Sequence, residues 1–299
     1  MTFDASVAAF RELFPPTRAD SDRPPLEVGN LRVQFGGLAA LKDVSFTMAS
    51  HETMSIIGQN GAGKSTLLNA ISGLVASTAD SRISVRGRAL NGVAAWRRAR
   101  SGLGRAFQDP PLVDEMTARE NLLLGAHSLL AGSQIDRFIR PRRVRREEDE
   151  IRARADVLLD LVGLTSRAEQ NAGSLPYGAR KLLDVARGLM SQPDVLLLDE
   201  PTSGLDSSEQ QVVEGILQLI HASERLSILM VEHHMELVRS VSDRVLVLNA
   251  GSVELIATPD EALGHPAATG APSAAATPSA SAAGPTDRPT LDSAGRNDS

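Results

Sequence analysis

The sequence predicts an α/β fold in which a mainly parallel sheet carries a phosphate-binding loop and has an antiparallel edge. Three observations support this prediction. Residues 58–66 match the P-loop pattern G-x-x-x-x-G-K-[ST]. Residues 195–198 are a fully apolar run that ends in two carboxylates, which is typical of a strand buried on both faces of a parallel sheet. Residues 26–33 alternate apolar and polar side chains, which predicts a half-buried strand beside that sheet.

The P-loop lies in the context that its chemistry requires, between a short apolar strand at residues 53–57 and a helix at residues 67–71. Its glycines allow backbone N–H groups to face phosphate oxygens, and the helix adds its positive N-terminal end. Lys64 can reach the β- and γ-phosphates, and the Ser65 hydroxyl can ligate Mg²⁺. The candidate nucleotide-binding residues of the loop are Gly58, Gln59, Asn60, Gly61, Ala62, Gly63, Lys64, Ser65 and Thr66.

Composition limits the classes of function. The chain has 299 residues with 42% hydrophobic side chains, enough for one large domain or two small ones. Its net charge of −6 gives no support to nucleic-acid binding, and its lack of cysteine excludes disulfides, cysteine-ligated zinc and thiol catalysis. The sequence has neither a signal-peptide pattern nor an apolar run of about 20 residues. We therefore expect a soluble protein that reaches a membrane only through a partner.

In the first half of the chain, strand signals alternate with turns. Residues 1–25, with two Pro-Pro pairs and mixed charges, predict a disordered extension. Thr117 and Glu120 form a capping-box pattern that opens a helix through His127. The other elements expected here are strands at residues 26–33, 44–48 and 82–85 and a short basic helix at residues 94–100.

An arginine-rich stretch between residues 137 and 146 precedes four acidic residues, 147–150. One interpretation is a basic patch for anionic lipid or nucleic acid. The other is a solvated loop that runs into a helix whose first turn carries the acids. The adjacent acids favour the second interpretation, because they cancel most of the local charge. The helix is expected to include residues 151–162 and to end near Gly163.

The second half alternates helices with buried strands, as βα units do. Residues 266–299, rich in Ala, Ser, Pro, Thr and Gly, predict a disordered tail. The expected helices run from the 175–179 segment to Met190 and from about residue 208 to 222. The expected strands are residues 195–198, 228–231, 245–248 and 253–256, the last two as a hairpin around Gly251.

The two carboxylates after the apolar run at residues 195–198 have chemical roles beside a P-loop. Asp199, at the carboxyl end of its strand, is expected to face the Mg²⁺ site, because sheets of this type bind ligands at that edge. Glu200 follows directly and is placed to polarise a water molecule. Phe35, at the turn after the first strand, fits either a core position or stacking on a purine.

Further stretches complete a known pattern, in the same order along the chain: Gln108, residues 175–179, residues 203–206 and His233. Over about residues 26–258 the sequence resembles the ATP-binding subunit of an ABC transporter. The resemblance implies that Phe35 stacks on adenine, that Glu200 is the general base and that His233 is the switch histidine. It also implies that Gln108 senses both Mg²⁺ and the membrane partner. The implied catalytic residues are then Glu200, His233 and Gln108, and the implied metal ligands are Ser65, Gln108 and Asp199.

Two stretches take roles across a subunit dimer by the same resemblance. The signature segment is expected to touch the γ-phosphate held by the opposite subunit, and it consists of Leu175, Pro176, Tyr177, Gly178 and Ala179. The interface loop is expected to cross the dimer interface, and it consists of Ser203, Gly204, Leu205 and Asp206. Pro176 departs from the serine that often bonds the γ-phosphate, Ala179 from a frequent glutamine and His234 from a common aspartate.

Within this family, the sequence is most similar to importers of branched-chain amino acids. The features that carry this similarity are the Leu-Pro-Tyr-Gly signature, the Phe-Gly-Gly-Leu edge at residues 35–38 and the arginine-rich insertion. The resemblance implies ATP and Mg²⁺ as cofactors and a second ATPase subunit, identical or different, as a partner. It also implies integral-membrane permease subunits, an extracytoplasmic solute-binding protein, no nucleic acid, and a cytoplasmic location on the inner face of the membrane.

The resulting expectation is a P-loop NTPase (RecA-like) domain of the ABC ATPase type at residues 26–265. Its core comprises residues 26–108 and 191–258, and a helical subdomain comprises about residues 109–190. Such a protein hydrolyses ATP to power transport, with branched-chain or related amino acids as the expected solutes. The alternatives are an importer of another small solute, such as urea or amides, and a non-transport ABC ATPase, which the lack of sustained heptads disfavours.

Overall fold

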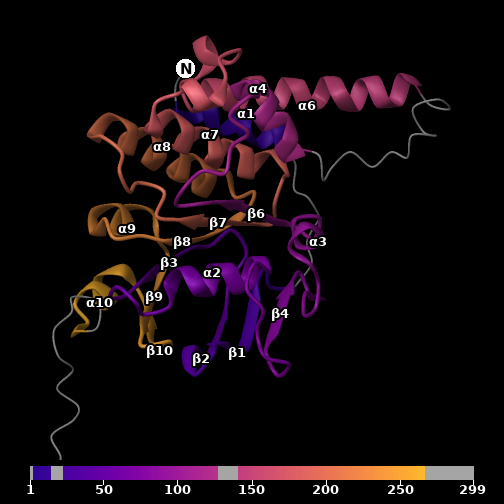
Figure 1. Ribbon diagram of the computed structural model, residues 1–299. Helices are drawn as coiled ribbons and strands as arrows, with labels where there is room; N and C mark the ends of the chain where they lie inside the picture. The colour runs from indigo at the N-terminus through magenta and orange to yellow at the C-terminus, as the bar shows by residue number, and fades with distance from the viewer. Residues whose placement is uncertain (1–2, 15–22, 127–140, 267–299) are drawn as a thin grey trace, which may run out of the picture.

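The computed structural model describes residues 3–14, 23–126 and 141–266. Within these ranges the strands form a six-stranded and a four-stranded sheet. Figure 1 shows α1, α4, α7 and α8 on one side of the six-stranded sheet and α2 on the other, between the two sheets. The predictions for the disordered tail, for residues 137–140 of the arginine-rich stretch and for the end of the helix at His127 lie outside the described residues. The rest of the arginine-rich stretch is not the expected loop, because the helix α6 (Pro141–Leu161) already begins there and its first turn carries none of the acids.

The six-stranded sheet has the order β10-β9-β3-β8-β7-β6. All neighbours pair in parallel except β9 and β10, which form the expected hairpin. Every residue of β3, β7 and β8 is buried, which explains why their sequences are mostly apolar and carry no charge before the last residue of β7. The strands are β3 (Thr53–Ile57), β6 (Leu103–Ala106), β7 (Val195–Asp199), β8 (Ser227–Val231), β9 (Arg244–Asn249) and β10 (Ser252–Ala257).

Alternate residues of the central strands enter two different hydrophobic cores. Leu196 and Leu198 of β7 pack in the core that contains α7 and α8. Val195 and Leu197 pack in the core that contains α2 and the strands of the other sheet. The strand is therefore covered on both faces, and its carboxyl end is the part left open for polar residues.

The four-stranded sheet is antiparallel and has the order β2-β1-β4-β5. It confirms the predicted antiparallel edge, although the second expected strand begins earlier, at Leu38. The strands are β1 (Glu27–Phe35), β2 (Leu38–Thr47), β4 (Arg82–Val85) and β5 (Arg88–Ala89).

The helices mostly follow the predicted pattern. Thr117 and Glu120 make both hydrogen bonds of a capping box at the start of α4. Of the helices described, none is both long and apolar enough to cross a bilayer. The helices are α2 (Lys64–Ser72), α3 (Ala95–Ala99), α4 (Ala118–Gly125), α6 (Pro141–Leu161), α7 (Tyr177–Met190), α8 (Ser207–Ser223), α9 (Met235–Val241) and α10 (Pro259–Leu263), with 3₁₀ turns at Thr165–Arg167 and Ala172–Ser174.

The prediction of disorder for residues 1–25 is wrong for the helix α1 (Phe3–Leu13). Phe10 and Phe14 stack with ring centroids 4.2 Å apart and are buried in the core shared by α6, α7 and α8. Arg11 donates from Nε to the Ser223 carbonyl (3.0 Å) and from Nη2 to the Ala222 carbonyl (2.9 Å) at the end of α8. The helix therefore depends on a surface formed more than 200 residues later, which local sequence cannot reveal.

Candidate functional site

The P-loop connects β3 to α2 and approaches two other backbone segments closely. A Cβ at Gly58 would lie 2.1 Å from the Leu248 carbonyl oxygen, and Gly58 has a φ of 154°. A Cβ at Gly63 would lie 2.8 Å from the Ala40 carbonyl oxygen, with a φ of 104°. Both positions require glycine, because any side chain would push the loop away from β9 or β2.

Lys64 is the buried cation of this loop. Its Nζ donates to the carbonyl oxygens of Gly58 (2.8 Å) and Gln59 (3.0 Å). Burial lowers the pKa of Lys64 from its ordinary value, while the charges of Glu200 and Asp199 oppose that shift. The ammonium group is thus held inside the curl of the loop, within the field of two carboxylates.

Asp199 lies at the end of β7, beside the first turn of α2. The Ser65 hydroxyl donates to its Oδ1 (3.3 Å), and the Arg105 guanidinium lies 3.4 Å from its Oδ2. Asp199 is 5% exposed; burial raises the pKa of its carboxyl group, and Arg105 opposes that shift. A hydroxyl and a carboxylate side by side form the hard oxygen donor set that suits Mg²⁺ bound together with phosphates.

Glu200 and His233 meet at the same edge of the sheet. Their side chains approach to 3.0 Å between Oε1 and Nε2. Glu200 has a left-handed backbone, with a φ of 48°, and its N–H donates to the Val231 carbonyl (2.9 Å), so the turn after β7 is tied to the end of β8. A carboxylate held by an imidazole at this open edge of the sheet can use its free oxygen to bind and polarise a water molecule.

Sequence reasoning missed the role of Glu232, which is 2% exposed. Its Oε1 accepts from the backbone N–H (3.0 Å) and the hydroxyl (2.5 Å) of Thr202. Its Oε2 accepts from the backbone N–H groups of His233 (2.7 Å) and His234 (3.1 Å). One buried carboxylate therefore fixes the loop after β7 against the loop after β8. A carboxylate directly after an apolar strand was the available signal, the same one that indicated Asp199.

Phe35 lies at the rim of a cleft of about 550 Å³ above the P-loop. It is 51% exposed, so the core interpretation of this residue is wrong. The other residues lining the cleft include Ala39, Lys42, Gly61, Lys64, Ser65 and Glu200. An exposed aromatic ring beside a phosphate-binding loop can stack on a base.

The signature segment and the interface loop lie side by side in a separate cluster, where a Cβ at Gly204 would lie 3.1 Å from Cε1 of Tyr177. The Tyr177 hydroxyl donates to the Gln108 carbonyl (3.2 Å), and Nζ of Lys181, also on α7, donates to the Ser203 carbonyl (2.6 Å). A Cβ at Gly178 would lie 1.8 Å from Oε1 of Glu209, so α8 packs directly on this glycine. In the described part of the chain, no residue of the signature segment lines the P-loop cleft.

The interface loop ends at the N-cap of α8. Both hydrogen bonds of a capping box are present: the Asp206 carboxylate accepts from the N–H of Glu209 (2.9 Å), and the Asp206 N–H donates to the Glu209 carboxylate (3.1 Å). The hydrogen bonds that the Asp206 carboxylate accepts from the Glu209 N–H and the Ser208 hydroxyl lower its pKa. Gln108 is exposed, and among the described residues no hydrogen bond joins its side chain to Ser65 or Asp199.

A second cleft, of about 390 Å³, opens between the sheet and the helices. Leu74, Trp96 and Leu124 lie at it with exposed apolar side chains. Arg97 and Arg100 hold their guanidinium carbons 4.8 and 5.5 Å from the Trp96 ring centre. Exposed apolar side chains that gather at a groove indicate a contact surface for another protein.

The chain matches known proteins over most of its length. A family model described as ABC transporter matches residues 41–203. The chain is 36% identical to the high-affinity branched-chain amino acid transport ATP-binding protein LivG of Salmonella typhimurium, over 82% of this chain and 95% of that protein. The same figures hold for BraF of Pseudomonas aeruginosa, which carries the same description. Identity to the sulfate/thiosulfate import ATP-binding protein CysA of Methylococcus capsulatus is also 36%, but only 65% of that protein is covered.

Solved structures agree with these matches. A nucleotide-free ATP-binding cassette from an ABC transporter has a TM-score of 0.68 at 26% identity, covering 82% of this chain and 97% of that one. A dimeric ATP-binding cassette in a post-hydrolysis state, bound to ADP and Pi, has a TM-score of 0.68 at 25% identity, covering 78% and 98%.

Proposed function

Because the chain belongs to the ABC transporter family, in which it is an ATP-binding and ATP-hydrolysing subunit, we propose that it powers import of branched-chain or related amino acids. The choice of solute rests on the share of each relative's length that this chain covers. The chain spans 95% of LivG and of BraF but 65% of CysA, although the identities are equal. Urea or amides remain the alternative solutes, since an ATPase subunit contacts the permease and not the cargo.

In this proposal residues 26–265 form one ATPase domain, with about residues 109–190 as its helical subdomain. The packing of α4, α6 and α7 against one another supports a helical unit, and the core that they form continues into α8, β7 and β8. The two core segments, residues 26–108 and 191–258, share the six-stranded sheet.

ATP lies in the P-loop cleft. Phe35 stacks on adenine, the N–H groups of residues 58–66 bind the phosphates, and Lys64 turns from the loop carbonyls to the β- and γ-phosphates. Ser65, Asp199 and Gln108 are the residues that would hold Mg²⁺, and a bound Mg²⁺ would neutralise charge that develops on the phosphates.

The chemical step uses Glu200 and His233. Glu200 orients and polarises the attacking water, and His233 holds the Glu200 carboxylate by the hydrogen bond described above. Lys64 and the backbone N–H groups stabilise the charge on the transferred phosphoryl group, which is the larger contribution to the rate.

A second ATPase subunit, identical or different, completes the site. The signature segment of one chain faces the γ-phosphate held by the other. Pro176 has no side-chain donor and occupies the N-cap of α7, so the N–H groups of the first turn and the helix dipole bind the phosphate.

Integral-membrane permease subunits occupy the groove at Leu74, Trp96 and Leu124, since its apolar rim needs a partner. An extracytoplasmic solute-binding protein delivers the solute. The chain then sits peripherally on the inner face of the cell membrane, in the cytoplasm.

The variant Glu200→Gln tests the chemical step. It keeps the shape and the hydrogen bond but removes the negative charge, and loss of general-base help is typically about 10²–10⁴-fold in turnover. ATP binding should survive, because Lys64 and Asp199 are unchanged. The variant should therefore accumulate as an ATP-bound dimer on size-exclusion chromatography with MgATP. Wild-type turnover, or a monomer that binds ATP normally, would show that Glu200 does not have this role.

Uptake measurements test the solute. Cells that express this chain with its permease should take up labelled leucine or isoleucine, and cells with Glu200→Gln should not. Uptake of urea and not of leucine, with the same dependence on Glu200, would select the alternative solute.

A further inference from the structure

The loop that contains Gln108, residues 107–114, is attached to one face of α7. Four α7 side chains contact it, spaced by three, four and three residues, and this spacing places them on one side of a helix. The four residues are Tyr177, Arg180, Asp184 and Arg187.

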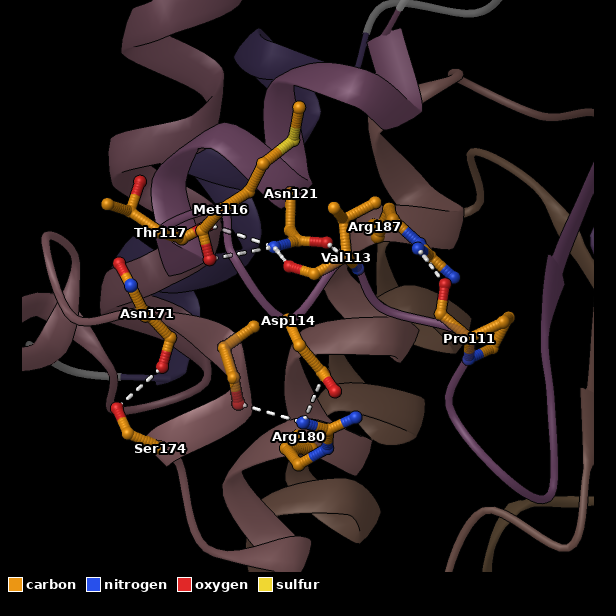
Figure 2. Close-up of polar contacts among 11 residues, drawn as sticks. Pro111, Val113, Asp114, Met116, Thr117, Asn121, Asn171, Ser174, Arg180 and Arg187 are labelled. Atoms are coloured by element: carbon orange, nitrogen blue, oxygen red, sulfur yellow. Dashed lines mark hydrogen bonds and ion pairs between the residues drawn. The ribbon is translucent and has the colours of Figure 1, made fainter.

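The contacts extend along the loop from its first residue. Asp184 Oδ2 accepts from the Phe107 N–H (2.8 Å), and Arg187 Nη1 donates to the Pro111 carbonyl (2.8 Å). Farther along, Arg180 Nη1 donates to the Asp114 carboxylate (2.6 Å). Figure 2 shows the Arg180 and Arg187 contacts, with both side chains pointing from α7 toward the loop.

Asp184 and Arg187 also pair with each other, at 2.5 Å between Oδ1 and Nη2. The Asp184 side chain is 0% exposed and that of Arg187 is 16% exposed. A buried ion pair is retained without penalty only when further hydrogen bonds satisfy both partners. Here those hydrogen bonds end on Phe107 and Pro111, one on each side of Gln108.

The far end of the loop is attached to α4. Asn121, which is fully buried, accepts from the Val113 N–H (2.9 Å) and donates to the Val113 (3.0 Å) and Thr117 (3.0 Å) carbonyls. Figure 2 shows its amide enclosed by these groups. Ala106, in contrast, pairs with Leu198 in the sheet. The chain therefore passes from the sheet to the helices between Ala106 and Phe107, directly before Gln108.

We propose that Asp184 and Arg187 are positioning residues for Gln108: together they fix the backbone on both sides of it and so connect its position to the signature segment at the start of α7. The inference rests on the proposed role of Gln108 in hydrolysis.

A buried ion pair could instead serve stability alone. In that case its loss would lower the melting temperature without any dependence on Gln108. A double-mutant cycle separates these roles, because two residues that act through one another do not have multiplicative effects.

The experiment compares Asp184→Asn, Gln108→Ala and the double variant in steady-state ATP hydrolysis, below the melting temperature of each protein. In Asp184→Asn the side chain has one acceptor oxygen, so it cannot accept from both Arg187 and the Phe107 N–H, and one of the two contacts is lost. We expect kcat to fall about 10- to 100-fold, since a misplacement of 1 Å can cost about 10²-fold, with KM for ATP nearly unchanged. In the Gln108→Ala background, Asp184→Asn should cause no further loss.

Asp156→Asn is the matched control, because it removes a carboxylate that pairs with Arg119 at the surface of the same subdomain. It should leave kcat unchanged. If Asp184→Asn does not fold, the less buried Arg187 serves in the same cycle, and Arg187→Lys should retain more activity than Arg187→Met.

Multiplicative losses in the double variant would overturn the inference while leaving the proposed function intact. Wild-type turnover of Gln108→Ala would overturn both the inference and the role of Gln108. A wild-type protein that does not hydrolyse ATP would instead contradict the proposed function itself.

Discussion

Replacing Phe10 with alanine should show how much α1 contributes to stability. The Phe10 side chain is 2% exposed and stacks on Phe14 at 4.2 Å. A buried Phe→Ala substitution typically costs about 3–5 kcal/mol, and a stacked aromatic pair contributes about 0.5–1.5 kcal/mol of that. The loss has a ceiling, however, because α1 can detach. An 11-residue helix is marginal by itself, so detachment also unfolds it.

The loss of stability in Phe10→Ala therefore cannot exceed the whole contribution of α1, and this limit gives a prediction. Phe10→Ala and a chain lacking residues 1–14 should lose nearly the same free energy of unfolding, because the first variant already releases the helix. Urea denaturation followed by circular dichroism measures both. Glu12→Ala is the control, since Glu12 is exposed on the same helix and alanine favours helices, so its midpoint should match that of wild type. A loss below about 1 kcal/mol for Phe10→Ala, or an equal loss for Glu12→Ala, would refute the reasoning.

Three further predictions concern the site. Lys64→Ala should abolish hydrolysis and weaken ATP binding sharply, because it removes the buried cation of the P-loop; near-normal turnover would contradict the assignment. Gly178→Ala should reduce ATP-dependent dimerisation, since its Cβ would meet Glu209 Oε1 at 1.8 Å, and adding Glu209→Ala should restore it, as measured by size-exclusion chromatography. Glu232→Gln should lower both the melting temperature and kcat, because its amide cannot accept all four hydrogen bonds and buried unpaired groups cost about 1–3 kcal/mol. An unchanged kcat with a lower melting temperature would limit Glu232 to a structural role.

The parts of the fold that sequence predicted are those encoded locally. The P-loop spacing, the apolar runs of β7 and β8 and the capping box at Thr117 each involve residues within about one turn or one strand of one another. Their geometry follows from backbone rules that apply in any fold, and the structure confirms these elements.

The parts that sequence did not predict depend on distant partners. The strand β6 has two small residues and the charged Arg105, so its sequence lacks a strand pattern. Residues 103–106 form a strand because they pair with β7. From the sequence, Glu232 is only the residue after a buried strand. Its role follows from the hydrogen bonds to Thr202, which lies 30 residues earlier in the chain. The face of α7 that holds the Gln108 loop uses charged residues, which by pattern alone belong on a solvent-exposed face.

At Phe35 the structure excludes one of two alternatives, the core position, and leaves stacking as a proposal. The position of Phe35 at a turn allowed either a core or a stacking role, because sequence does not report which side of a turn faces a ligand. The structure exposes it at the P-loop cleft, since β1 ends there and the next residues turn back as β2.

The sheet order determines when the P-loop can form during protein synthesis. The strand β3 has β8 on one side and β9 on the other, and both come from the last third of the chain. At about 5–20 residues per second, the roughly 190 residues between β3 and the end of β9 take on the order of 10–40 s to synthesise. During that interval the glycine-rich loop has no Leu248 carbonyl above it, so a ribosome-bound chain should be unable to bind nucleotide until residue 249 has left the exit tunnel.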